Sequence, residues 1–179
     1  MLKKNIKNLE IRPKKQGLYD PEFERDSCGV GLVANIKGVP SREIMDDAYI
    51  INSRMDHRGG CGFEENTGDG AGILLALPHE FFKEEAKKLK INLPEKGNYA
   101  VGNIFFPQKK SEKDFCKKTI EDVLKQEKLE FLGWRQVPID SKKADVGPAA
   151  LDCKPGIEQI FIKAPKNIDQ NDFERKLYL

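Results

Sequence analysis

Cys28 is the residue of this 179-residue chain whose type and position could do the most chemistry. A polar leader of mixed charge precedes it, and Gly29 and a run of strand-forming residues follow it. Cleavage of the bond between Ser27 and Cys28 would place a thiol and a free α-amine on one residue. An α-amine has a pKa of about 7.7–8.0, so it can act as a base near neutral pH. A thiol with an adjacent base is an activated nucleophile that needs no separate histidine.

Cys28 also has a purely structural interpretation, because free cysteine is often fully buried at the start of a strand. Position alone favours that interpretation, whereas the wider sequence around the cysteine favours an N-terminal nucleophile. While Ser27 remains attached, the nitrogen of Cys28 is an amide and cannot take a proton from the thiol. Removal of residues 1–27 is therefore a chemical requirement of the nucleophile hypothesis.

Apolar spacing along the chain predicts alternating strands and helices, a mixed α and β fold. Strands are expected at residues 29–36, 73–77, 99–106, 130–138 and 157–163. Helices are expected from the capping residue Ser41 to 54–57, over 79–90 after Pro78, from the capping residue Ser111 to Gln126, and from Asp169 onward. The inward-facing residues predicted for the first three helices are Ile44, Ala48, Ile51 and Met55, then Phe81, Phe82, Ala86 and Leu89, then Cys116, Ile120, Val123 and Leu124.

Composition narrows the class of protein. A length of 179 residues predicts one domain, and a net charge of +2 with 34% charged residues indicates an ordinary soluble surface. No basic stripe with interleaved aromatic residues is present, so nucleic-acid binding is not expected. The leader lacks the apolar core of a secretory signal, and no segment is apolar enough to span a membrane. The four cysteines show no Cys-x-x-Cys spacing, so no metal or iron–sulfur site is expected in this segment, and a cytoplasmic location with reduced thiols is expected.

Six motifs in sequence order resemble the large chain of the glutamate synthase family. They are residues 20–31 (DPEFERDSCGVG), 55–60 (MDHRGG), 65–74 (ENTGDGAGIL), 78–82 (PHEFF), 133–138 (GWRQVP) and 173–178 (FERKLY). The similarity runs from about Gly17 to the last residue, and six ordered motifs are far more specific than any one of them. One small departure is Gly60, where members of the family often have alanine.

The resemblance implies a class II glutamine amidotransferase domain with the N-terminal-nucleophile hydrolase fold. That fold is a four-layer αββα sandwich, in which two sheets pack face to face between helical layers. Residues 1–27 would be a propeptide removed before Cys28, and residues 28–179 the front part of the domain. We expect truncation at the C-terminus, because the last predicted helix stops at Leu179 without a terminating signal. In the family an Asn-Gly pair from a later segment supplies the oxyanion donors, and this sequence contains no Asn-Gly dipeptide.

The implied reaction begins with attack of Cys28 on the side-chain amide of L-glutamine. A glutamyl thioester forms and ammonia leaves, and water then releases glutamate. In the family the ammonia serves the reductive amination of 2-oxoglutarate in downstream synthase domains of the same chain. FMN and an iron–sulfur cluster belong to that region, and the electron donor is a small reductase subunit or ferredoxin.

Arg58 is the first of the residues expected in the pocket. It could bind the last carbonyls of the preceding helix, whereas the resemblance implies a place in the glutaminase pocket. There its guanidinium would fix the surroundings of the nucleophile or pair with a substrate carboxylate. His57 could act as a general base, but with an α-amine available it is expected to support the loop.

Asn66, Gly68 and Asp69 lie in a glycine-rich stretch that we expect to line the same pocket. Asn66 and Asp69 could supply hydrogen bonds to the pocket or could be ordinary turn formers. The stretch lacks the lysine of a phosphate-binding loop, so a nucleotide-binding function is the weakest hypothesis. The main alternative to an enzyme is a catalytically silent glutamine-binding or regulatory module that retains the fold.

Overall fold

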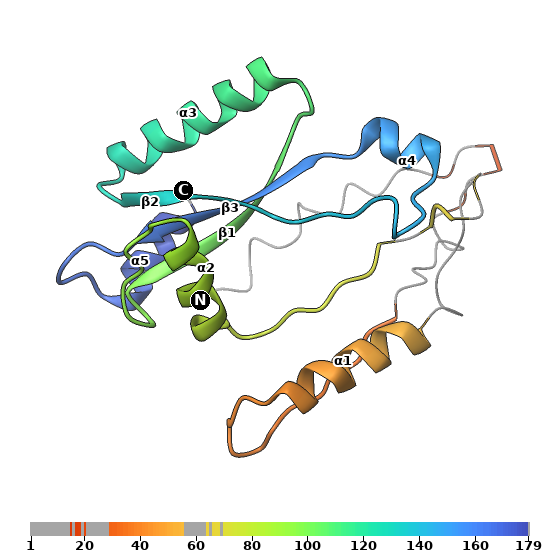
Figure 1. The fold of residues 1–179 in the computed structure, drawn as a ribbon, viewed down its shortest axis with the longest axis horizontal. Helices are drawn as coiled ribbons and strands as arrows, with labels where there is room; N and C mark the ends of the chain where they lie inside the picture. Colours follow the sequence, from red (N-terminus) through yellow and green to blue (C-terminus); the bar gives the residue numbers. More distant parts are fainter. Residues whose placement is uncertain are drawn as a thin grey trace. The chain divides into compact units, whose positions relative to one another are not determined.

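The computed structural model describes four residues of the leader, Lys15, Gly17, Leu18 and Asp20, and then residues 29–55, 64, 66–68 and 70–178 (Figure 1). These residues fall into two compact units. The first unit contains the described leader residues, 29–55 and 70–73. The second unit contains 64, 66–68 and 74–178.

A three-stranded antiparallel sheet is the centre of the second unit. Its strands are β1 (Tyr99–Phe106), β2 (Glu130–Gln136) and β3 (Gly156–Lys163), in the order β1-β3-β2. Both outer strands run antiparallel to β3, so they run parallel to each other, and helix α3 (Lys110–Gln126) connects them. The three strands predicted in this region are confirmed to within two residues at each end.

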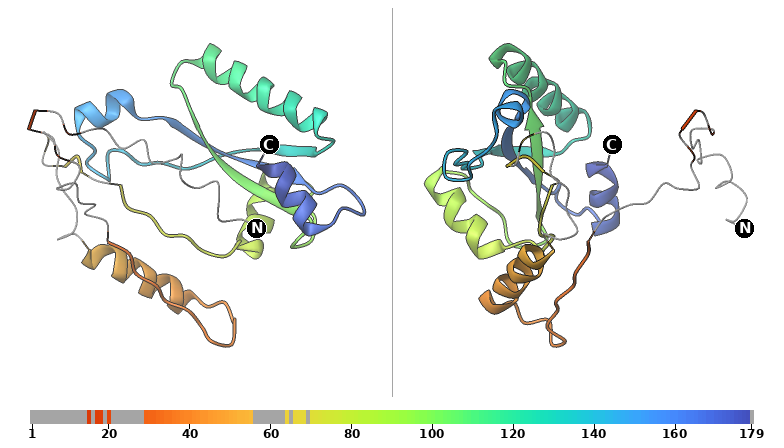
Figure 2. Two further views of the ribbon diagram at one scale, coloured as in Figure 1. Left: turned by 180° about the vertical axis from the view of Figure 1, so that it is seen from behind. Right: turned by 90° about the vertical axis from the view of Figure 1, so that its right-hand side faces the viewer.

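Both faces of this sheet are covered at least in part by helices. On one face Leu124 of α3 and Phe173 of α5 (Gln170–Leu177) pack against Ile160 and Ile162 of β3. On the other face Phe82 of α2 (His79–Lys88) packs against Phe161. Figure 2 shows α3 and α5 on one side of the sheet and α2 on the other. Successive side chains of a strand point to opposite faces, so β3 presents apolar residues, Ile160 and Ile162 on one side and Phe161 on the other, to both.

Some of the residues predicted to face inward from α2 and α3 are buried, and others at the edges of the predicted apolar faces are exposed. Phe82 and Ala86 of α2 are buried as predicted, whereas Phe81 and Leu89 are 47% and 44% exposed. In α3, Leu124 is buried and Val123 is 39% exposed. The apolar stripe that reaches the sheet is thus narrower than the sequence pattern predicted.

Helix caps in the second unit agree only in part with the prediction. The side chain of Asp169 accepts a hydrogen bond from the backbone N–H of Asn171, which confirms the start of α5. The prediction that Ser111 caps α3 is wrong. The cap position is Lys109, whose carbonyl accepts from the N–H groups of Glu112 and Lys113. Helix α3 begins at Lys110, so Ser111 already lies inside its first turn.

Helix α4 (Pro148–Cys153) lies in the long connection between β2 and β3, where no sequence pattern predicted a helix. Proline occupies its first turn, where a missing N–H costs nothing. At the C-terminal end of α4, the side-chain amide of Gln108 donates to the carbonyls of Leu151, Asp152 and Lys154 at 2.9–3.2 Å. This helix depends on a partner more than 40 residues away, which local patterns do not reveal.

The first unit contains helix α1 (Arg42–Arg54) and the extended segment before it. The hydroxyl of Ser41 accepts from the N–H of Ile44 at 3.3 Å, which confirms the predicted cap. All four residues predicted to face inward from α1 are partly buried. A Cβ on Gly31 would collide with Ile51 and Met55, so the segment lies against α1 at a point that only glycine permits.

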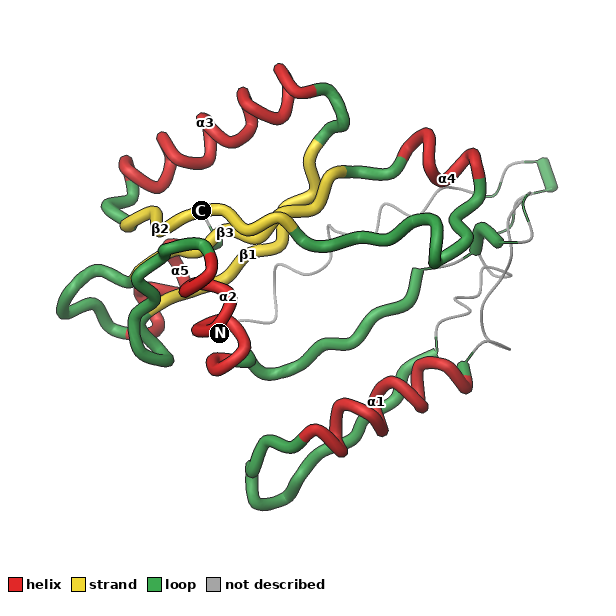
Figure 3. The backbone as a smooth tube through the Cα atoms, viewed as in Figure 1, coloured by secondary structure: helices red, strands yellow, loops and turns green. Residues whose placement is uncertain are grey.

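The predicted strands 29–36 and 73–77 are wrong for the described structure. Both segments are loops (Figure 3), and Val30, Leu32 and Leu74 are 90%, 89% and 101% exposed. A strand needs a hydrogen-bonded neighbour, and strand propensity cannot supply one. The α+β class is confirmed by the helices and the antiparallel sheet, whereas the two-sheet, four-layer arrangement stays a prediction.

Candidate functional site

The structure describes only some of the predicted site residues. Cys28, Arg58 and Asp69 lie outside the described residues, as does His57. Asn66 and Gly68 are described and belong to the second unit. The geometry of the candidate site is therefore that of the loop from Glu64 to Gly68, and the roles of the other residues stay predictions.

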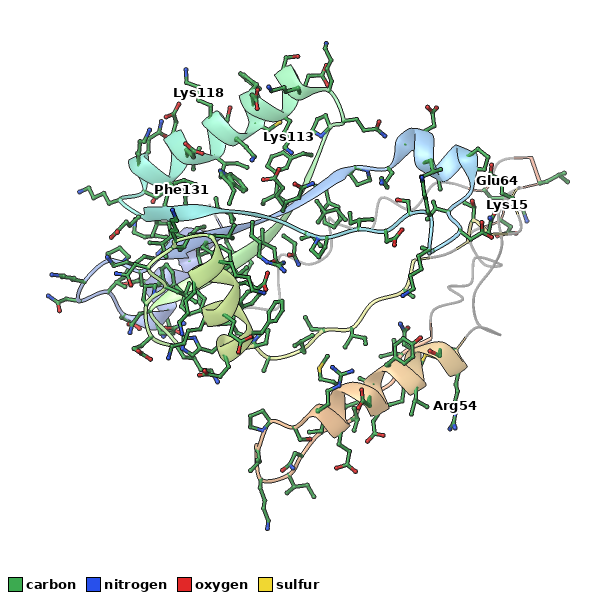
Figure 4. All side chains as sticks on the ribbon, viewed as in Figure 1. Lys15, Arg54, Glu64, Lys113, Lys118 and Phe131 are labelled. Atoms are coloured by element: carbon green, nitrogen blue, oxygen red, sulfur yellow. The ribbon has the colours of Figure 1, made fainter. Side chains whose placement is uncertain are left out.

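Glu64 attaches this loop to the start of α4. Its carboxylate accepts the backbone N–H of Ala149 at 3.0 Å and 3.3 Å and the hydroxyl of Thr67 at 2.7 Å. The N–H of Thr67 also donates to the carbonyl of Glu64 at 3.1 Å, which closes a turn. Figure 4 shows the Glu64 side chain beside the α4 segment of the ribbon. A single carboxylate thus holds both its own turn and a helix 85 residues later in the chain.

Asn66 makes a second attachment to the same connection. Its side-chain N–H donates to the backbone carbonyl of Asp145 at 2.6 Å. Asp145 has a φ of 49°, a left-handed conformation that aspartate tolerates better than most residues. Asn66 is therefore more than a local turn former, because its side chain fixes a long-range contact. A contact of Asn66 with substrate stays a prediction.

Gly147 is the residue that allows Glu64 and Thr67 to approach α4. It is buried and occupies the position just before the helix. A Cβ there would collide with the Oε2 of Glu64 and the Oγ1 of Thr67. Gly147 thus leaves space for the observed positions of these two side chains.

The environment of Glu64 favours its charged form. Its pKa is lowered from the ordinary value, first because the N–H of Ala149 bonds to the carboxylate and second because the Thr67 hydroxyl does so. Sequence reasoning missed both Glu64 and Gly147. The only local signal was an acidic residue three positions before a threonine, and neither the partner helix nor its distance in sequence could be inferred from that.

A second polar group lies on the sheet face that α2 covers. Arg135 donates to Oε2 of Glu85 at 2.9 Å and 2.8 Å and to Gln159 at 2.9 Å. Gln159 in turn donates to Asn103 at 3.0 Å, so the row crosses all three strands in register. The pKa of Glu85 is lowered, chiefly by its hydrogen bond from Lys88 and then by that from Arg135. We interpret this row as a structural attachment of α2 to the sheet.

A third polar group lies between α3 and the sheet face that α3 covers. Glu158 is 6% exposed and pairs with Lys113 and with Lys117, the latter at 2.6 Å. The ammonium of Lys117 also lies 4.9 Å from the centre of the Trp134 ring. Burial alone would raise the pKa of Glu158, but the hydrogen bonds from the two lysines outweigh it, and the net pKa is lowered. This cluster joins α3 to β3.

The described residues offer no group of three or more His, Cys, Asp and Glu side chains that could hold a metal ion. Over the same part of the chain, no helix is both long enough and apolar enough to cross a membrane.

Known proteins are similar to this chain over more than nine tenths of its length. Residues 28–179 match the family described as "Glutamine amidotransferases class-II", and the match begins at Cys28. The chain is 45% identical over 168 residues to "Glutamate synthase [NADPH] large chain" of Bacillus subtilis, covering 93% of this chain and 11% of that protein. It is 44% identical over 181 residues to "Glutamate synthase [NADH]" of Saccharomyces cerevisiae, covering 94% and 8%.

"Ferredoxin-dependent glutamate synthase 1, chloroplastic/mitochondrial" of Arabidopsis thaliana is 38% identical over 169 residues, which are 94% of this chain and 10% of that protein. The chain thus spans about a tenth of the length of these relatives. These similarities confirm the resemblance that the six ordered motifs indicated.

Proposed function

The chain belongs to the class II glutamine amidotransferases, and we propose that it is the glutaminase module of a glutamate synthase. The observation that carries this proposal is the family match, which starts at Cys28 and extends to the last residue. The relatives named above are all glutamate synthases, and each aligns over more than nine tenths of this chain. That agreement favours an enzyme module over a catalytically silent glutamine-binding module.

Cys28 would be the nucleophile, once residues 1–27 have been removed. Its α-amine takes the thiol proton, and the sulfur attacks the side-chain carbonyl carbon of glutamine. The carbon–nitrogen bond breaks, the protonated α-amine gives its proton to the leaving nitrogen, and ammonia is released. Water then attacks the thioester carbon, which yields glutamate and restores the thiol. Donors for the oxyanion would come from a later segment of the domain.

The pocket around the nucleophile would include Arg58, Asn66, Gly68 and Asp69. Arg58 would either fix the surroundings of Cys28 or bind a substrate carboxylate, as a guanidinium does well. The attachment of Asn66 to Asp145 supports a fixed position for the glycine-rich stretch. A loop held at defined points keeps its polar groups where a substrate can use them.

The four-layer αββα sandwich is part of this proposal. Family membership supports it, and so does the exposure of Val30, Leu32 and Leu74. Large apolar residues in extended segments are expected to gain neighbours when a sheet is completed.

Ammonia would pass from this module to a synthase region that aminates 2-oxoglutarate reductively. FMN and an iron–sulfur cluster would supply the electron transfer there. Partners would be L-glutamine, the synthase domains, and either a small reductase subunit or ferredoxin, with a cytoplasmic location. With free ammonia supplied, glutamate synthesis would not need this module, because the synthase region uses ammonia itself.

The test is the intact mass, the N-terminal residue and the activity of the full-length native protein. We expect a chain that begins at Cys28, releases ammonia from glutamine, and loses nearly all of that release in a Cys28→Ser variant. Ammonia-dependent glutamate synthesis should persist in the variant. A native protein that still begins at Met1, or a Cys28→Ser variant with wild-type turnover, would contradict the proposal.

A further inference from the structure

We propose that Glu64 is a positioning residue for glutamine hydrolysis, which holds the loop of Asn66 and Gly68 against the segment 145–149. The inference rests on the proposed function, because that function places Asn66 and Gly68 in the glutaminase pocket. It adds a role for two residues that no motif identified, Glu64 and Gly147.

The loop is fixed at two points that lie close together in sequence. Glu64 binds the N–H of Ala149 through both carboxylate oxygens, and Asn66 binds the carbonyl of Asp145. Two attachments restrict the positions of Glu64 and Asn66 more than either attachment alone would. The hydroxyl of Thr67, the residue after Asn66, also donates to the carboxylate of Glu64 at 2.7 Å.

The receiving surface is shaped for the carboxylate. Gly147 lacks the Cβ that would collide with Glu64 and Thr67, and Ala149 presents its N–H in the first turn of α4. The first N–H groups of a helix have no partner within the helix, so a carboxylate satisfies one of them. The fit between loop and helix thus depends on residues from both sides.

Glu64 is better suited to positioning than to proton transfer. Its oxygens accept hydrogen bonds from Ala149 and Thr67, and these bonds lower its pKa. A carboxylate with a lowered pKa is a weak base at neutral pH. Its effect on catalysis would therefore pass through the loop that it holds.

The experiment compares Glu64→Ala, Glu64→Gln and Glu84→Ala in the full-length enzyme. Glu84 is a matched control, because it is an exposed glutamate on α2. For each variant, kcat and KM are measured for glutamine, and the ammonia-dependent rate is measured in parallel. Misplacement of a pocket loop by about 1 Å can cost roughly 100-fold, so we expect kcat/KM for glutamine to fall about 10- to 100-fold in Glu64→Ala.

We expect the ammonia-dependent rate of Glu64→Ala to stay at the wild-type level. Glu64→Gln should recover most of the glutamine reaction, because its amide oxygen can accept from Ala149 and its NH₂ group can donate to Thr67. Glu84→Ala should behave as wild type. If Glu64→Ala does not fold, Thr67→Val removes one bond to the carboxylate at constant volume, and a several-fold loss of kcat/KM is expected.

Three results would overturn the inference. Wild-type kcat/KM in Glu64→Ala, or in Thr67→Val where Glu64→Ala does not fold, would show that the attachment is dispensable. A parallel fall of the glutamine- and ammonia-dependent rates would show a general loss of structure. A loss in Glu64→Gln as large as in Glu64→Ala would exclude hydrogen bonding as the cause. Wild-type enzyme without Cys28-dependent ammonia release would instead refute the proposed function, and the inference with it.

Discussion

Two regions of the chain contain equally apolar, strand-like sequences, but only one of them forms a sheet. In β3, Ile160 and Phe161 are buried on opposite faces and hydrogen-bonded to strands on both sides. In the segment 29–36, Val30 and Leu32 are almost fully exposed, although Gly31 lies against α1. The comparison teaches that apolar, β-branched sequence marks a strand only where the chain also provides neighbours for it.

Deletion of a central side chain should give the largest difference between the two regions. We expect Phe161→Ala to destabilise the chain by about 3–5 kcal/mol, because Phe161 is 0% exposed and packs between Phe82 and Tyr99. Leu32→Ala should cost less than about 0.5 kcal/mol. Urea unfolding of the two variants measures both values. A cost for Leu32→Ala close to that for Phe161→Ala would place residues 29–36 inside a packed sheet.

The second largest difference is expected between the charged contacts of the two regions, in how much each contributes to the free energy of unfolding. Glu158→Ala leaves two lysines without their buried acceptor, and we expect a loss of about 1–3 kcal/mol. The exposed helix pair of Arg42 and Asp46 in α1 should contribute only about 0.3–0.5 kcal/mol. Thermal unfolding of Glu158→Ala and Asp46→Ala tests the contrast. Equal losses in the two variants would contradict it.

Acid titration sharpens the same contrast. Because the pKa of Glu158 is lowered in the folded state, its contribution is present above the unfolded pKa of about 4.3. The contribution is lost as the pH falls from that value through the lower, folded pKa. We therefore expect the unfolding free energy of wild type to decrease more steeply below about pH 4.3 than that of Glu158→Gln. Parallel pH profiles would show that Glu158 does not contribute to this dependence.

Arg135 should show a smaller but specific effect. Arg135→Lys keeps the charge but loses the paired bonds to Glu85 and the separate bond to Gln159, and about 1–2 kcal/mol is expected. Arg42→Lys in α1, which keeps an exposed ion pair, is the matched control and should be nearly neutral. Denaturant midpoints of the two variants measure the difference, and a neutral Arg135→Lys would exclude a structural role for the row.

The smallest expected effect concerns the helix caps. Ser41→Ala and Asp169→Ala each remove a side-chain acceptor at a helix start, at a cost of about 1 kcal/mol. Asp169→Ala should lower global stability, because Phe173 ties α5 to the core. Ser41→Ala should reduce the protection of α1 amides from hydrogen exchange with little change in global stability. A global loss in Ser41→Ala would show that α1 unfolds together with the sheet.

The sequence by itself determined the features that depend on local chemistry. The apolar period placed β1 and α3, Ser41 and Asp169 fixed the starts of two helices, and the ordered motifs identified the family. Cys28 stood out because its type and position suggest a nucleophile with its own base. These features are readable because they involve residues a few positions apart or motifs in order.

Only the tertiary structure determined which apolar segments pair as strands and which polar residues form hydrogen bonds with each other. The attachment of Glu64 to Ala149 spans 85 residues, and that of Asn66 to Asp145 spans 79. The helix α4 that receives Glu64 was not predicted, and the glycine that makes room for it resembled any other loop glycine. Such contacts depend on how distant segments pack, because a hydrogen bond requires both partners at about 3 Å, and sequence spacing does not encode that distance.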